Sequence, residues 1–213
     1  PFIFQHGLGA NVHQPEDLFR PRDGFRFISM DCRNHGDTRP LSDPDKLNFD
    51  TFTSDLRSLL GHLGITRAVL GGISLGATAA LHYAQRYVDA EHRIDGLCLL
   101  APYPGSRLTT AAIRKSGART WHAATTQTQD SELQLWRWLI ERSLQLPVFL
   151  GYGREDRFAD GIALLVEMLP ASRVEVLPGG HDWPTWRLLW NAFIAQLEDF
   201  RLAPASAAAS RSW

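Results

Sequence analysis

This sequence has almost no net charge, only two cysteines and no long apolar run. Its 22 Lys and Arg residues nearly balance its 23 Asp and Glu residues, which gives a formal net charge of −1. A basic surplus is typical of nucleic-acid-binding proteins and an acidic excess of disordered ones, so neither class is indicated and we expect no nucleic-acid partner. No apolar run reaches the roughly 20 residues that a membrane-spanning helix needs, and no charged segment followed by an apolar one opens the chain. We therefore expect a soluble, cytoplasmic protein without a membrane span, whose oligomeric state the sequence does not define.

The two cysteines, Cys32 and Cys98, lie in or beside apolar segments that are typical of strands. Neither belongs to a C-x-x-C pair or to a Cys and His spacing that binds zinc. We expect two buried thiols and no metal site.

The chain is long and apolar enough to form one substantial core. Its 213 residues are 44% hydrophobic, which fits a single domain over residues 1–203. Short β-prone apolar segments alternate with segments of three- and four-residue apolar periodicity, and this alternation predicts an α/β fold with a mostly parallel sheet and helices on both faces. Residues 204–213 are rich in Ala and Ser and are expected to form a flexible tail.

The predicted elements follow one another along most of the chain. Strands are expected at 2–4, 25–30, 67–73, 94–100, 148–152 and 174–177. Helices are expected at 16–20, 49–64, 75–84, 133–144, 162–168 and 184–200. The pattern is weakest between residues 103 and 146, which we interpret as an insertion.

One stretch combines a strand, a turn and a helix around a single serine. Gly72, Ser74 and Gly76 form the pattern G-x-S-x-G, in which glycines permit a sharp strand-to-helix turn that exposes the serine hydroxyl. The pattern alone also fits a glycine-rich connection or a serine that caps the following helix.

Three polar residues at predicted strand ends occur in the order serine, acid, histidine. They are Ser74, Asp156 and His181. A serine hydroxyl needs an imidazole to accept its proton, and the imidazole needs a carboxylate to hold its tautomer, so these residues predict a catalytic triad. Glu155 is the first rival for the acid, and two further aspartates, Asp160 and Asp182, are close in sequence.

These motifs together resemble those of the α/β-hydrolase superfamily, in register over nearly the whole chain. The segments that carry the resemblance are His6 to Gly9 (H-G-x-G), Asp31 to Gly36 (D-x-R-x-x-G), Gly72 to Gly76 (nucleophile elbow), Gly153 to Arg157 (G-x-x-D-x) and Gly180-His181. The resemblance implies a serine esterase that acts on a small-molecule carboxylic ester or related acyl substrate and needs no cofactor or metal. The same triad also serves thioesterases, amidases, lactonases and carbon-carbon hydrolases, and some relatives of this fold bind ligands with little turnover.

The resemblance also assigns supporting residues. The backbone N–H groups of Leu8 and Leu75 are expected to form the oxyanion hole. His6, His35 and Asp31 are expected to brace the loops rather than to transfer protons.

The sequence allows two roles for each of four tryptophans, one in the substrate pocket and one in core packing. Trp183 is equally compatible with both roles. For Trp121, Trp136 and Trp138, core packing is weighed above a place at the entrance of the site.

The family usually has eight strands, and this sequence begins inside what resembles the third. We therefore expect the first two strands to be absent and one sheet edge to be exposed, unless a missing segment or a partner covers it. Residues 103–146 occupy the position of the family's cap and are expected to form a small or partial lid.

Overall fold

The computed structural model describes residues 1–18, 24–38, 47–88, 93–108, 131–167, 169 and 173–202, and all statements below concern these residues. The predicted tail at 204–213, Trp121 and half of the predicted insertion, residues 109–130, lie outside them.

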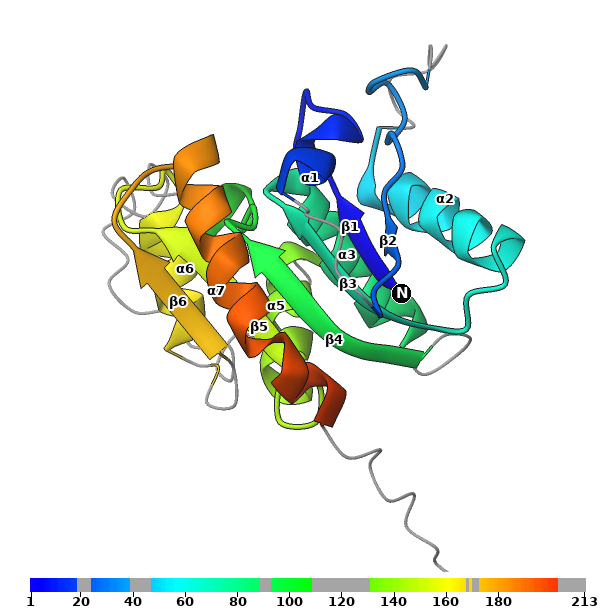
Figure 1. Ribbon diagram of the computed structural model, residues 1–213. Helices are drawn as coiled ribbons and strands as arrows, with labels where there is room; N and C mark the ends of the chain where they lie inside the picture. The colour runs from blue at the N-terminus through cyan, green and yellow to red at the C-terminus, as the bar shows by residue number, and fades with distance from the viewer. Residues whose placement is uncertain are drawn as a thin grey trace, which may run out of the picture.

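Six parallel strands form one sheet in the order β2-β1-β3-β4-β5-β6 (Figure 1). The strands are β1 (Phe2–Gln5), β2 (Phe27–Ile28), β3 (Arg67–Ile73), β4 (Arg93–Leu100), β5 (Val148–Gly153) and β6 (Arg173–Leu177). Because all the strands are parallel, their carboxyl ends meet at one edge of the sheet, where polar loop residues are brought together. The predicted parallel α/β architecture is confirmed.

The second predicted strand is much shorter than its apolar pattern indicates. We expected a buried strand at 25–30, but only Phe27 and Ile28 pair with β1, and both are half-buried. Among the described strands β2 lies at the end of the sheet beside β1 alone, so the described ladder hydrogen bonds hold it from one side.

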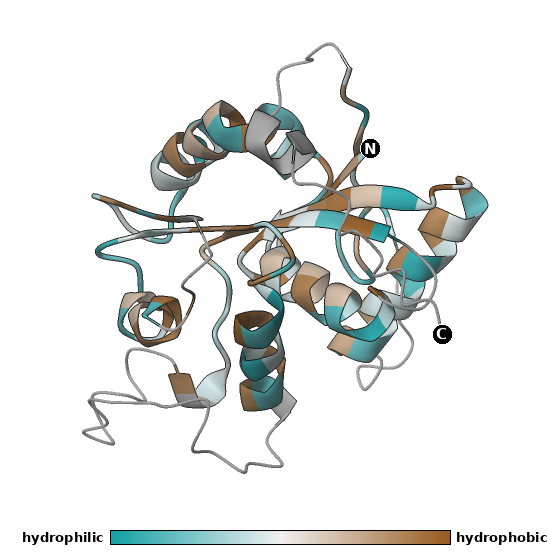
Figure 2. Cartoon of the chain, turned by 90° about the horizontal axis from the view of Figure 1, so that it is seen from below, coloured by the Kyte–Doolittle hydropathy of each residue, from teal (hydrophilic) through white to brown (hydrophobic). Residues whose placement is uncertain are grey.

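The helices flank the sheet on both faces, as Figure 2 shows. They are α1 (His13–Leu18), α2 (Phe49–His62), α3 (Leu75–Tyr87), α5 (Ser131–Arg142), α6 (Ala159–Val166) and α7 (Trp183–Leu202), with a 3-10 turn, η2, at Ser106–Leu108. One core joins one face of the sheet to α2, α3, α5 and α6, and the other joins the opposite face to α7 and to Leu18 of α1. Successive strand residues point to opposite faces, so Ile3 belongs to the first core while Phe4 belongs to the second.

Small residues let α3 pack closely on the sheet. Four alanines and a glycine are buried along this helix, and it lies against β1, β3 and β4. The opposite core is aromatic, because Phe2, Phe4, Trp190 and Phe193 form ring contacts with centroid separations of 5.4 to 5.7 Å. The two layers hold the carboxyl ends of β1, β3 and β5 in fixed relative positions.

Both cysteines are free and buried, as predicted. Burial raises the pKa of Cys32 to about 12 and the pKa of Cys98 well above its ordinary value.

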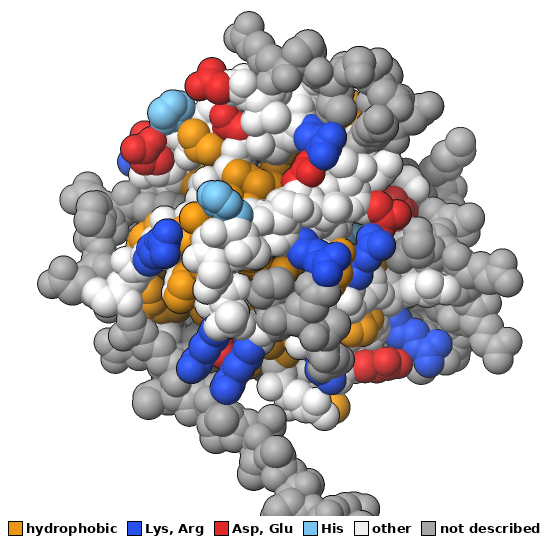
Figure 3. All heavy atoms as spheres, turned by 90° about the vertical axis from the view of Figure 1, so that its right-hand side faces the viewer, with side chains coloured by type: hydrophobic (Ala, Val, Ile, Leu, Met, Phe, Trp, Pro, Cys, Tyr) orange, Lys and Arg blue, Asp and Glu red, His pale blue; other side chains and the backbone are white. Residues whose placement is uncertain are grey.

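The surface carries charges of both signs, and Figure 3 shows basic and acidic side chains near one another on the face that includes α2. Several arginines are compensated locally, as in the pairs Arg86–Asp50 (2.8 Å) and Arg93–Asp95 (3.1 Å). No helix of the described residues is long and apolar enough to span a bilayer.

Candidate active site

The sharp turn between β3 and α3 places Ser74 in a backbone conformation that non-glycine residues rarely adopt. Its φ is 53° and its ψ is −116°, and its N–H donates to the carbonyl of Leu100 on the neighbouring strand (2.9 Å). A residue held in such a conformation stores about 1 to 3 kcal/mol of strain, which the surrounding packing must offset. Ser74 therefore forms the turn between β3 and α3, and the packing around it holds this strained backbone conformation.

The two glycines of the motif are needed for contact between backbones. A Cβ atom added at Gly72 would lie 2.3 Å from the carbonyl carbon of Gly76, and one added at Gly76 would lie 2.3 Å from the oxygen of Gln5. The motif therefore packs against itself and against the end of β1, in agreement with the predicted nucleophile elbow.

A chain of two hydrogen bonds joins the three predicted triad residues. The Oγ of Ser74 lies 3.0 Å from Nε2 of His181, and Nδ1 of His181 lies 2.7 Å from Oδ2 of Asp156. The side chain of Asp156 is fully buried and that of His181 is 10% exposed. An ionised Asp156 can only accept a hydrogen bond, so it places the imidazole proton on Nδ1 and leaves Nε2 free to accept the serine proton.

The rival acids have other partners. The second oxygen of Asp156 accepts the N–H of Phe158 (2.8 Å), which fixes the carboxylate toward His181. Oε2 of Glu155 accepts the N–H of Gly179 (2.5 Å), and Asp182 accepts both the amide (3.0 Å) and the hydroxyl (2.7 Å) of Thr185 at the start of α7. The hydrogen bonds from Thr185 lower the pKa of Asp182.

Glycines also bring the acid loop and the histidine loop together. A Cβ atom added at Gly153 would lie 2.1 Å from the oxygen of Gly179, and Gly179 itself has a φ of +121°. The N–H of Glu155 donates to the same Gly179 oxygen (3.0 Å). The loops after β5 and β6 thus form one unit that holds Asp156 beside His181.

His6 is buried in the loop after β1 and contacts only backbone groups there through its ring nitrogens. Its Nε2 accepts the N–H of Cys32 (3.0 Å), so Nδ1 carries the proton and donates it to the carbonyl of Gly7 (2.8 Å). Burial lowers the pKa of His6, which favours this neutral form. The predicted bracing role of His6 is confirmed.

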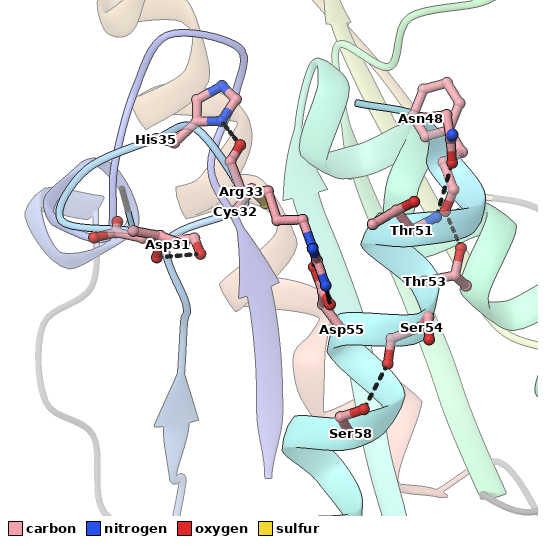
Figure 4. A network of polar contacts seen from close by, with 12 residues as sticks. Asp31, Cys32, Arg33, His35, Asn48, Thr51, Thr53, Ser54, Asp55 and Ser58 are labelled. Atoms are coloured by element: carbon pink, nitrogen blue, oxygen red, sulfur yellow. Dashed lines mark hydrogen bonds and ion pairs between the residues drawn. The ribbon is translucent and has the colours of Figure 1, made fainter. Parts of the chain in front are cut away.

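The loop after β2 is braced in the same manner. Asp31 accepts the N–H groups of Val12 (2.7 Å) and Asp37 (2.9 Å), and Nδ1 of His35 donates to the carbonyl of Arg33 (2.7 Å). Arg33 forms a bidentate pair with Asp55 of α2, with N–O distances of 2.5 and 2.7 Å (Figure 4). The predicted bracing roles of Asp31 and His35 are confirmed, and Arg33 joins this loop to α2.

The predicted oxyanion donors lie in the two segments that meet at Ser74. A Cβ atom added at Gly7, the residue before Leu8, would lie 3.6 Å from Cβ of Ser74. Leu75 is the first residue of α3, where backbone N–H groups lack partners within the helix. The side chain of Leu8 is 77% exposed, which leaves an apolar group at the surface beside the site.

Two aromatic rings that the sequence analysis did not assign to the site enclose His181. Phe158 and Trp186 meet its ring edge-on, at centroid separations of 5.1 and 5.2 Å and interplanar angles of 81° and 89°. Phe158 follows Asp156 by two residues and Trp186 follows His181 by five, so short spacing to the triad residues was the available signal.

The tryptophans proposed for the pocket pack on two different cores, with Trp183 on one face of the sheet and Trp136 and Trp138 on the other. Trp183 contacts Trp186 at 6.4 Å and packs on the aromatic core. Trp136 is 1% exposed and its Nε1 donates to the carbonyl of Pro104 (2.8 Å), which is the core-packing alternative. Trp138 is partly buried against the core that contains Trp136.

The sequence and the structure of this chain both resemble those of alpha/beta hydrolases. A family model described as the alpha/beta hydrolase fold matches residues 1–138. The AB hydrolase superfamily protein YisY of Bacillus subtilis is 35% identical over 106 residues, which cover 47% of this chain and 37% of that protein. The sn-1-specific diacylglycerol lipase ABHD11 of Danio rerio is 40% identical over 84 residues, or 38% of this chain and 26% of the lipase. The matched regions thus span about a third of these relatives.

Solved structures resemble the chain over nearly its full length. A thermophilic esterase from Thermogutta terrifontis superimposes with a TM-score of 0.66 and 21% identity, covering 94% of this chain and 90% of the esterase. At this identity the likeness establishes the fold.

Proposed function

The chain belongs to the alpha/beta hydrolase fold family, and we propose that it is a serine hydrolase that cleaves carboxylic esters through an acyl-enzyme. The observation that carries the proposal is the continuous hydrogen-bonded chain from Ser74 through His181 to Asp156. The fold alone does not select a reaction, whereas this arrangement supplies a nucleophile, a base and an orienting acid.

The first half of the reaction forms the acyl-enzyme. Nε2 of His181 takes the hydroxyl proton of Ser74 as Oγ attacks the ester carbonyl, and the N–H groups of Leu8 and Leu75 stabilise the negative oxygen. His181 then gives its proton to the leaving alkoxide, the carbon-oxygen bond breaks, and the alcohol departs.

The second half returns the enzyme to its starting state. His181 takes a proton from water, the hydroxide attacks the acyl carbon, and the proton passes to Oγ of Ser74 as the acid leaves. Throughout, Asp156 stabilises the imidazolium and holds its tautomer without itself taking the proton.

The ester is the favoured substrate class because two of the similar proteins are described as a lipase and an esterase. Thioesters, amides, lactones and carbon-carbon bonds are the alternatives that the same groups can attack. A panel of matched esters, thioesters and lactones, compared by kcat/KM, would rank these classes.

The experiment that tests the proposal compares the wild type with Ser74→Ala on p-nitrophenyl acetate and butyrate. We expect turnover by the wild type and loss of it in the variant, together with covalent labelling of Ser74 by a fluorophosphonate. Equal rates in both proteins would overturn this proposal and leave the alternative of a ligand-binding protein with little turnover.

A further inference from the structure

We propose that Gln14 is a positioning residue that fixes the direction of the Leu8 N–H toward the reacting carbonyl. This inference rests on the proposed function, because it concerns the oxyanion donor of that reaction. Gln14 lies on α1, the short helix over the carboxyl end of β1 (Figure 1).

Gln14 and His6 hold the two sides of Gly7. Oε1 of Gln14 accepts the N–H of Gly7 (2.7 Å), and Nδ1 of His6 donates to the carbonyl of Gly7 (2.8 Å). The first bond fixes the peptide plane before Gly7 and the second fixes the plane after it. Glycine has the widest backbone freedom of any residue, so both planes need external partners to hold one orientation.

The second plane is the one that carries the Leu8 N–H. In a trans peptide the C=O and the N–H point in opposite directions, and the described chain has no cis peptide bonds. Because the Gly7 carbonyl points to His6, the Leu8 N–H points away from His6. The two planes turn independently about the Cα of Gly7, so the Leu8 N–H keeps one direction only while Gln14 holds the first plane and His6 holds the second.

These two hydrogen bonds to Gly7 lie next to Ser74, the proposed nucleophile. A Cβ atom added at Gly7 would lie 3.5 Å from Oε1 of Gln14 and 3.6 Å from Cβ of Ser74, so these two side chains flank the same side of the glycine. Asp31 holds the start of α1 through the N–H of Val12 (2.7 Å). Gln14 therefore reaches Gly7 from a helix whose position is itself fixed.

The test uses two variants of Gln14. Gln14→Met keeps the length of the side chain but removes the acceptor oxygen, and Gln14→Ala removes the same oxygen without adding a long apolar side chain. Loss of a complete oxyanion donor lowers kcat about 100- to 1,000-fold, so misdirection of one donor should lower kcat about 10-fold. KM for p-nitrophenyl butyrate should change less than twofold. A trifluoromethyl ketone, which forms a tetrahedral oxyanion on Ser74, should bind about 10-fold more weakly.

His13→Met is the matched control, because His13 is the exposed neighbour of Gln14 on α1 and bonds only to Glu16 in the described contacts of its side chain. It should keep the wild-type kcat. Unchanged kcat in both Gln14 variants, or a rise in KM alone, would overturn the inference while Ser74→Ala remained inactive. If Ser74→Ala were as active as the wild type, the proposed function itself would fail.

Discussion

The chemistry of this protein depends on single atoms that the neighbouring residues hold in place. Asp156 and Glu155 are adjacent in sequence, yet only Asp156 contacts the imidazole, while Glu155 accepts the N–H of Gly179. Adjacent carboxylates therefore have different tasks because the backbone turn sends their side chains to different loops.

Asp156→Asn should lower kcat about 10,000-fold, because an amide can donate to Nδ1 and so favours the wrong imidazole tautomer. Glu155→Gln is the control, since its amide oxygen still accepts from Gly179, and kcat should stay within about threefold. Steady-state kinetics on p-nitrophenyl butyrate would measure both. The opposite ranking would make Glu155 the acid.

Trp186 should act through the shape of its ring, because its buried Nε1 has no hydrogen-bond partner among the described residues and its ring forms a T-shaped contact with His181. Trp186→Phe should therefore keep kcat within about threefold, whereas Trp186→Ala should lower it about 10-fold by freeing the imidazole. Unfolding by urea should show both variants folded under assay conditions. A larger loss in the Phe variant would indicate that the indole N–H has a role.

At the scale of elements, the site is made by contacts between strand ends and the helices that follow them. The glycines at the β3–α3 turn allow backbone to touch backbone, while other glycines occupy open positions. A Cβ atom at Gly61 of α2 would meet nothing within 4 Å. Both positions are glycine in the sequence, and only the packing around them shows which glycine touches another backbone and which faces open space.

Gly76→Ala should destabilise the protein by more than about 3 kcal/mol or prevent folding, because its methyl group would overlap the carbonyls of Gln5 and His6. Gly61→Ala, inside an exposed part of α2, should stabilise it by about 0.5 to 1 kcal/mol. Free energies of unfolding from urea titration would check both. A tolerated Gly76→Ala would contradict the close approach.

The α2–α3 contact contains a histidine that resists protonation. His82 stacks on Phe49 at 4.4 Å, and burial lowers its pKa from 6.5 to about 4. The unfolded state therefore binds this proton more readily, so stability is lost as pH falls from about 6.5 toward 4. At pH 5 the loss should be about 1 to 2 kcal/mol, allowing for partial solvent screening.

His82→Phe keeps the stacking and removes the titration, so its stability should fall less between pH 7.5 and pH 5 than that of the wild type. His6, whose pKa is also lowered, is present in both proteins and its effect cancels in the comparison. Identical pH profiles of the unfolding free energy would contradict the role of His82.

At the scale of the molecule, the sequence predicts the layers well and the edges poorly. Strands β4 and β5 are mostly apolar and buried along most of their length, and both lie within one residue of their predicted ranges. The predicted range of the edge strand β2 is too long, because an apolar run does not show how many neighbouring strands it pairs with. The contact of Phe158 and Trp186 with one imidazole depends on how two loops and α7 pack, which no local pattern contains.

The two thiols probe two parts of the core, because Cys32, in the loop after β2, is 3% exposed and Cys98, in β4, is fully buried. The native protein should react with Ellman's reagent at neither cysteine within minutes, and with both after unfolding in guanidinium chloride. Rapid reaction of one thiol in the native state would indicate that the core opens locally.

The bond between Ser74 and His181 joins residues 107 positions apart. Such a contact closes a loop that contains β4, β5 and β6, three of the six described strands, so we expect it to form after these strands have aligned beside β3. Local helices and turns form without it. The proposed triad is therefore expected to assemble late in folding, and a nascent chain that has not yet reached His181 would carry the proposed nucleophile without its base.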